Sequence, residues 1–506
     1  MLALRGRVST IRARGLAVGV RSHDVSILVG LAHPAASGEA VDRAVRLGAN
    51  EVCSAGGVGA RDLGGLVRRM ADATPPERDR TIDFLRAASI LAVVCGHWLV
   101  ATIQRIPHGI EVGNVLSEVS GLRPVTWVFQ VMGVFFVVGG FSTRRAIEGR
   151  SGFDSGAFFA ARAERLLRPT VMFIVAWLGA AAAFTAFGVD AALVHDIARI
   201  AAQPLWFLAV YLVVTLIAPV QLRIHRSAPL ALVVVLPMAV VGLDALRFSD
   251  VAPGLAVLNY LFVFAFAQEL GFHFAGRANP ISVTRVLTVA AVAVAALGLL
   301  TTVGPYPVSM VGLPGAHVSN MSPPTVCILV LTLAQTAVLF ALRPTLARWL
   351  ERRGPWTCTV AMNAGIMTIF LWHLTAAAAM GGFFYSVNWL PAPASATWWW
   401  AKIPWFIGCL VILVPLVLVT VGVERLPSWT RGQRGAVARR TLGVLVAVRG
   451  LAGFAVTGFD HLLEPGGRAF LGLELSPLVD LILVAGGYLL TCGIPQPGAG
   501  RRSNTM

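Results

Sequence analysis

Long apolar stretches, separated by short polar segments, occupy most of this 506-residue chain. Ten of them lie between residues 78 and 425, and each approaches the roughly 20 residues that a helix needs to cross a bilayer. A segment inside a bilayer must satisfy its own backbone hydrogen bonds, so each stretch is expected to be a helix. The predicted fold class is all-α: a polytopic transmembrane helix bundle with a ten-helix core and up to two additional C-terminal helices.

The composition agrees with this class, because 56% of the residues are hydrophobic and only 13% are charged. A soluble chain has about 25% charged residues. The first predicted span is Ile82–Gln104. The next nine are Pro124–Phe141, Pro169–Phe187, Leu205–Leu222, Leu230–Leu246, Gly254–Phe274, Val286–Val303, Thr325–Leu342, Met362–Tyr385 and Ile403–Val423. Two weaker candidates follow at Leu442–Phe459, with Arg449 near its middle, and Leu471–Cys492.

Three regions are expected along the chain. Residues 1–77 are rich in Arg, Ala and Gly, and no apolar run among them is long enough to span a bilayer. They are interpreted as an N-terminal extension that is disordered or comes from a mis-called start, since Met70 opens a short lead into the first span. The alternative is a small cytoplasmic domain or regulatory arm. Residues 78–425 form the transmembrane core, and residues 426–506 form a basic linker, one or two weaker transmembrane segments and a polar tail.

The basic residues are distributed unevenly between the two sides of the predicted bundle, although the formal net charge is +16. If the N-terminus is cytoplasmic, the inner loops carry clusters of arginine. The outer loops then carry only five basic residues in all, namely Arg105, Arg123, Arg199, Arg247 and Lys402. By the positive-inside rule, this predicts a multi-pass protein of the plasma membrane with both termini cytoplasmic. Topology thus explains the charge, so the expected partner is the lipid bilayer and not nucleic acid.

Two ionisable residues, Arg86 and His97, interrupt the first apolar span. Such residues are costly inside a membrane and mark functional sites by default. Eleven residues of helix separate them by about 16 Å and nearly three whole turns, so both point to one side. His97 has the chemistry of a general base, while Arg86 can hold a phosphate or carboxylate. The alternatives are a structural histidine and an arginine that extends to the lipid headgroups. Asp83, one turn earlier, can pair with Arg86.

Further candidates lie in later segments. Arg162, Arg165 and Arg168 recur every three residues and form a predicted basic ridge at the inner membrane surface, either an anion site or part of the topological charge bias. His373 lies deep in a later span and is a possible cavity residue. Trp206 is another, although an interfacial aromatic belt also explains it. The cysteines are scattered, with no CxxC pair and no histidine cluster at ligand spacing, so neither a disulfide framework nor a metal is expected.

Taken together, several motifs resemble the acyltransferase 3 family of integral membrane acyltransferases. The most specific is DFLRAASILAVVCGH, which begins at Asp83 and ends at His97. FFVVGGFSTR is similar to the second-helix pattern of the family, with Gly139 where serine is commoner. RAERLLRP, PLWFL and FLWH resemble its inner-loop RxxR, its fourth helix and its late-helix histidine. The resemblance covers about residues 78–425.

This resemblance implies transfer of an acyl group, often acetyl, from cytoplasmic acyl-CoA to a hydroxyl group. The implied acceptors are cell-surface glycans, lipid-linked sugars or glycosylated small molecules. His97 would be the catalytic histidine, Arg86 the essential arginine, and Arg162 and Arg165 the RxxR pair that binds the donor. Acyl-CoA is thus a donor substrate, and no permanently bound cofactor is expected. The competing hypotheses are a multi-helix transporter or flippase without acyl transfer, and a sensor or scaffold without catalysis.

Overall fold

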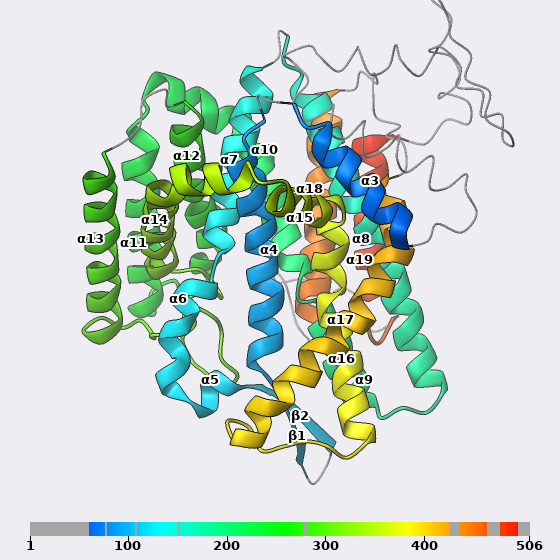
Figure 1. Cartoon of the computed structure of the whole chain (residues 1–506). Coiled ribbons are helices and arrows are strands. Elements are labelled where there is room, and N and C mark those ends of the chain that lie inside the picture. Colours follow the sequence, from blue (N-terminus) through cyan, green and yellow to red (C-terminus); the bar gives the residue numbers. More distant parts are fainter. Residues whose placement is uncertain are drawn as a thin grey trace, which may run out of the picture.

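The computed structural model describes residues 60–75, 78–106, 109–149, 152–276, 282–425, 436–462 and 476–493. Within these ranges the chain is a helical bundle, and eleven of its helical segments are long and apolar enough to cross a membrane. The helix α4 (Arg80–Val100) runs through the middle of the bundle (Figure 1). A multi-pass, all-α membrane protein is therefore confirmed.

Long helices and short connecting segments alternate along the chain, as the apolar stretches predict. The first half contains α3 (Ala60–Asp72), β1 (Ala101–Ile106), β2 (Gly109–Asn114), α5 (Val115–Glu118), η2 (Ser120–Val125), α6 (Thr126–Phe129), α7 (Met132–Glu148), α8 (Ser155–Ala186), α9 (Ala191–Ala202) and α10 (Leu205–Ser227). The second half contains α11 (Ala231–Phe248), η3 (Pro253–Leu258), α12 (Asn259–Ala275), α13 (Val283–Thr302), α14 (Val326–Leu350), α15 (Arg353–Ala364), α16 (Ile366–Ser386), α17 (Ala396–Arg425), α18 (Val437–Thr457) and α19 (Pro477–Cys492).

The central helix α4 is shorter than the sequence predicts. Asp79 caps its start by accepting hydrogen bonds from the first-turn amides, and it ends at Val100. The prediction that this helix continues to Gln104 is wrong, because Ala101–Ile106 turns into strand β1 and pairs with β2. Lys402 of α17 donates hydrogen bonds to the carbonyl of Ala101 at 2.7 Å and to that of Trp98 at 3.1 Å, which satisfies the helix end.

The helix α8 is longer than predicted, because Pro169 lies inside it instead of starting a new span. Asp154 caps the helix, and the chain stays helical from Ser155 to Ala186. The hydroxyl of Thr170 donates to the carbonyl of Leu166 within the helix, whereas the carbonyl that loses its amide donor to the proline is that of Arg165. The arginines that the sequence places in a loop before a span are therefore fixed on the first half of one long helix.

The helices α7 and α12 approach each other at two glycines. A Cβ atom on Gly140 would lie 2.2 Å from the carbonyl oxygen of Gln268, and one on Gly271 would lie 2.1 Å from that of Val137. Small residues allow such backbone contact between membrane helices. This close packing fixes the position of α7, which carries Ser142 toward α4.

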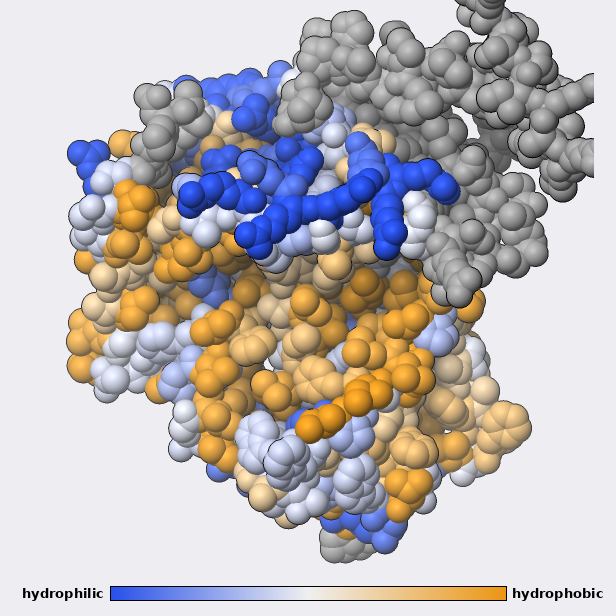
Figure 2. Space-filling view, viewed as in Figure 1, coloured by the Kyte–Doolittle hydropathy of each residue, from blue (hydrophilic) through white to orange (hydrophobic). Residues whose placement is uncertain are grey.

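The end of the bundle near the start of α4 is covered by α3 and α15. Met70 and Ala71 pack against Trp356 and Val360, and the Trp356 indole donates to the carbonyl of Ala71. Residues 1–59 and 76–77 of the extension lie outside the described residues. The part that is described contains the docked helix α3, and the interpretation of the extension as disordered or from a mis-called start stays a prediction. Hydrophilic surface gathers at this end, above a largely apolar middle (Figure 2).

The C-terminal pair α18 and α19 packs on α8 and also contacts α10. The predicted eleventh span is present as α18, whose Arg449 forms an ion pair with Asp480 of α19 at 3.3 Å. The twelfth candidate is shorter than predicted: α19 has 16 residues and begins at Pro477. A Cβ atom on Gly487 would lie 2.5 Å from the backbone of α18, so the two helices touch closely.

Candidate functional site

His97 of α4 faces His373 of α16. The ring centroids lie 5.3 Å apart, with the rings tilted by 48°. Because α4 ends at Val100, His97 lies in the last helical turn. It is therefore close to the end of the helix. The predicted span, which continues to Gln104, places it deeper inside. The structure thus brings together two histidines that lie far apart in the sequence.

The imidazole of His373 is held in one orientation. Its Nδ1 lies 2.6 Å from the carbonyl oxygen of Phe370 and donates to it. The Trp98 indole also donates to the backbone carbonyl of His373, at 2.9 Å. The Nε2 atom of His373 is buried and has no hydrogen-bond partner among the described residues. Buried polar atoms are usually paired, so this unpaired nitrogen next to His97 marks a place for a ligand atom.

Arg86 lies on α4 toward the opposite end of the helix. Its guanidinium donates to the hydroxyl of Ser142 on α7 at 2.8 Å and contacts the buried carboxylate of Asp83 at 3.3 Å. Asp83 also accepts a hydrogen bond from Arg78. The expected pairing of Arg86 with Asp83 is present. Because two arginines share one carboxylate, this end of α4 keeps a net positive charge.

Arg162 adds a second positive charge beside Arg86. It donates to the phenol of Tyr211 on α10 at 3.1 Å and lies 4.8 Å above the ring of Phe158. The charges of Arg165 and Arg86 both act on it. The three arginines of α8 do not form one continuous ridge, because Arg168 pairs with Glu164 in a part of α8 that packs against the C-terminal helices.

A line of ring contacts joins the arginines to the histidines. It starts at Tyr211, whose ring centroid lies 6.0 Å from that of Phe207. Phe207 lies 5.0 Å from Phe370, and Phe370 lies 5.9 Å from His373. A Cβ atom on Gly139 would make an ordinary contact with the Tyr211 ring, at 3.5 Å, so α7 packs directly beside this line. An apolar wall therefore runs from a positively charged end to a pair of imidazoles.

Trp206, the other predicted cavity residue, belongs to a neighbouring aromatic cluster. Its ring centroid lies 5.7 Å from that of Tyr260 and 6.4 Å from that of Phe264, both on α12. It contacts the line of rings through Phe207, at 6.2 Å. Trp206 thus packs between Phe207 and the aromatic rings of α12.

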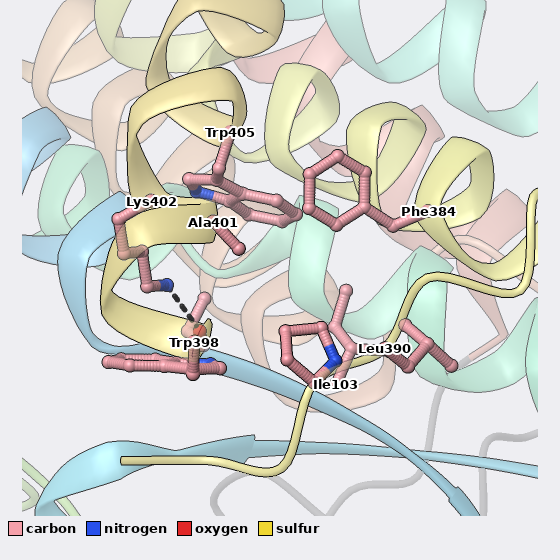
Figure 3. Close-up of a pocket in the computed structure, with 9 residues that line it drawn as sticks. Ile103, Phe384, Leu390, Trp398, Ala401, Lys402 and Trp405 are labelled. Atoms are coloured by element: carbon pink, nitrogen blue, oxygen red, sulfur yellow. Dashed lines mark hydrogen bonds between the residues drawn. The ribbon is translucent and has the colours of Figure 1, made fainter. Parts of the chain in front are cut away.

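A small aromatic pocket lies at the end of α4 near His97. Trp398 and Trp405 of α17 line it together with Phe384 of α16 and Ile103 of β1, and Lys402 reaches across it to the carbonyl of Ala101 (Figure 3). The ammonium group of Lys402 lies 4.2 Å from the centroid of the Trp398 ring.

Sequence reasoning missed a second histidine cluster. His225 of α10 meets Glu269 and His273 of α12, with their potential ligand atoms within 4.8 Å of one another. His225 Nδ1 lies 2.5 Å from Glu269, while its Nε2 lies 3.0 Å from the Arg144 guanidinium. Because Arg144 can only donate, Nε2 accepts and Nδ1 donates its proton to Glu269. A metal ion on Nδ1 would place a proton on Nε2 against Arg144, so this cluster is a hydrogen-bonded ion-pair network.

A family model described as an acyltransferase domain, that of the acyltransferase 3 family, matches residues 79–422. The match begins at the residue that caps α4 and ends within α17, so it includes every residue of the ring line and both arginines. The helices α18 and α19 lie beyond it. No curated protein and no solved structure was found to match the chain.

Proposed function

The chain belongs to the acyltransferase 3 family of membrane acyltransferases, and from this premise we propose which groups it transfers. The donor is cytoplasmic acyl-CoA, with acetyl as the acyl group. The acceptor is a hydroxyl of a cell-surface glycan, a lipid-linked sugar or a glycosylated small molecule. The observation that carries this proposal is the ring line, which connects a doubly positive end to two facing imidazoles.

The positive end suits the donor. Coenzyme A carries phosphates, and arginine binds phosphate with two parallel hydrogen bonds. The charges of Arg86 on α4 and Arg162 on α8 act on each other, so a phosphate between them relieves their repulsion. The apolar wall formed by Tyr211, Phe207 and Phe370 then accompanies the pantetheine arm toward His373.

The imidazole end suits the chemistry. A hydroxyl is a weak nucleophile and needs a base at its oxygen. His97 takes the hydroxyl proton as the oxygen attacks the thioester carbon; the carbon–sulfur bond breaks, and His97 passes the proton to the leaving thiolate. The unpaired Nε2 of His373 accepts a hydrogen bond from a neighbouring hydroxyl of the acceptor. About 16 Å of helix separates this step from Arg86.

The charge distribution indicates from which side of the membrane each substrate arrives. We place the basic end of the bundle on the cytoplasmic side of the plasma membrane, because arginine-rich loops stay inside. Acyl-CoA then enters beside Arg86. His97 lies in the last turn of α4 at the opposite end, and the aromatic pocket of Trp398 and Trp405 lies just past the end of that helix, at Ala101 and Ile103. The acceptor therefore arrives from the outer side.

The test is acetyl transfer by membranes that contain the chain. Labelled acetyl-CoA is supplied with an extract of cell-surface glycans, lipid-linked sugars and small glycosides, and mass spectrometry identifies the acetylated product. Wild type is expected to label an acceptor and His97→Ala to label none. His317→Ala, an exposed histidine of a loop, serves as the matched control and is expected to behave as wild type. Full labelling by His97→Ala would refute the mechanism, and no consumption of acetyl-CoA by wild type would favour a transporter.

A further inference from the structure

A groove opens at the end of the bundle that holds Arg86, outside the site described above. The ends of α7 and α10 and the segment before α8 form it, and its lining residues are Ile147, Glu148, Phe153, Pro219, Leu222, Arg223 and Arg226. Its floor is apolar, because Ile147 and Leu222 are buried in one small cluster with Phe153 packed against them. Two arginines of α10 stand on its rim.

The rim has a net positive charge. Glu148 is the one acidic residue among the lining residues, and it is shared by Arg144 at 2.9 Å and Arg226 at 3.3 Å. Arg223 has no ion-pair partner within the described ranges of the chain. A groove with an apolar floor and a surplus of guanidinium groups fits a ligand that has both a flat ring and phosphates.

Packing contacts link the groove to the positively charged end of the site. The ring of Phe153 lies 5.6 Å from that of Phe158, and Arg162 lies directly over Phe158 at 4.8 Å. Along α10, the eleven residues from Tyr211 to Leu222 span about 16 Å and three turns, so both side chains point the same way. The groove and the start of the ring line therefore lie on the same side of α10.

We propose that this groove binds the 3′-phosphorylated ADP end of coenzyme A, with Arg223 and Arg226 on its phosphates and Phe153 against its adenine. This assignment rests on the proposed function, because it places the remainder of the same donor. The pantetheine arm then passes Arg162 and Tyr211 and brings the thioester to His97. The groove is thus a recognition site for the nucleotide, spatially separate from the reacting atoms.

The experiment compares two donors, acetyl-CoA and acetyl-pantetheine, which lacks the nucleotide. With wild type, acetyl-CoA is expected to have the lower KM. In Arg223→Gln/Arg226→Gln, the KM for acetyl-CoA is expected to rise about tenfold, as for loss of exposed hydrogen bonds to a charged group. The kcat and the KM for acetyl-pantetheine stay within twofold. Arg285→Gln, an exposed arginine at the start of the distant helix α13, is the matched control and leaves both donors unchanged.

Other outcomes overturn the assignment. If the double variant raises the KM of both donors equally, or if Arg285→Gln has the same effect, the arginines act only through general surface charge. A direct measurement covers the case in which wild type transfers no acyl group. Purified protein in detergent is titrated with adenosine 3′,5′-bisphosphate; binding that is lost in the double variant supports the groove, whereas binding that persists refutes it.

Discussion

Gly140→Ala tests the packing that positions Ser142 against Arg86. The added Cβ atom would lie 2.2 Å from the carbonyl oxygen of Gln268, where an ordinary contact needs 3.4 Å. The obstacle is backbone and cannot rotate away, so α7 and α12 must move relative to each other by about 1 Å, an overpacking that typically costs about 1–3 kcal/mol.

The same movement acts on the site. The hydrogen bond from Arg86 to Ser142 is 2.8 Å long, and the useful range of such bonds is only about 0.5 Å wide. A displacement of about 1 Å therefore breaks it. Misplacement on this scale reduces an enzymatic rate by up to about 100-fold.

The assay has two parts: thermal unfolding of the purified protein in detergent and acetyl transfer at saturating acetyl-CoA. Gly140→Ala is expected to lower both the melting temperature and the rate. The control is Gly298→Ala on α13, where a Cβ atom meets nothing within 4 Å; removing a helical glycine there is expected to stabilise by about 0.5–1 kcal/mol. If Gly140→Ala is as stable and active as Gly298→Ala, the close approach of α7 and α12 is wrong.

Three further substitutions test other parts of the molecule. Lys402→Met removes two hydrogen bonds from the end of α4 and is expected to lower kcat about tenfold with KM for acetyl-CoA unchanged; a rise in KM alone would contradict a role in positioning His97. Asp244→Ala leaves buried donors of Asn259 and Val326 without an acceptor, so the unfolding free energy should fall by about 1–3 kcal/mol for each; an unchanged melting temperature would disprove these contacts. Gly487→Leu should separate α18 from α19 and lower the melting temperature, and full stability would show that the two helices do not touch there.

The spans were predictable because a bilayer imposes a length and an apolar composition on each helix. The common face of Arg86 and His97 stays a prediction, and it depends only on the geometry of one helix. The pairing of Asp83 with Arg86 follows from the same local periodicity. These are properties of neighbours within a single helix, and the sequence carries them directly.

Contacts between helices were not predictable in the same way. The end of α4 at Val100 depends on Lys402, a residue of α17 that caps it from a distant part of the sequence. The cluster of His225 and Glu269 depends on how α10 packs against α12, and single-sequence spacing gives no sign of it. The ring line likewise joins residues of α10 and α16, such as Phe207 and Phe370, whose individual positions look like ordinary apolar core.

Equilibrium binding of coenzyme A to the purified variants tests the central claim most directly, namely that the two ends of the site have separate tasks. His97→Ala is expected to bind coenzyme A with the wild-type Kd and to transfer no acetyl group. Arg86→Ala is expected to bind at least tenfold more weakly, as for loss of a charge-assisted phosphate contact. Loss of binding in His97→Ala, or wild-type binding in Arg86→Ala, would contradict the separation of donor binding from proton transfer.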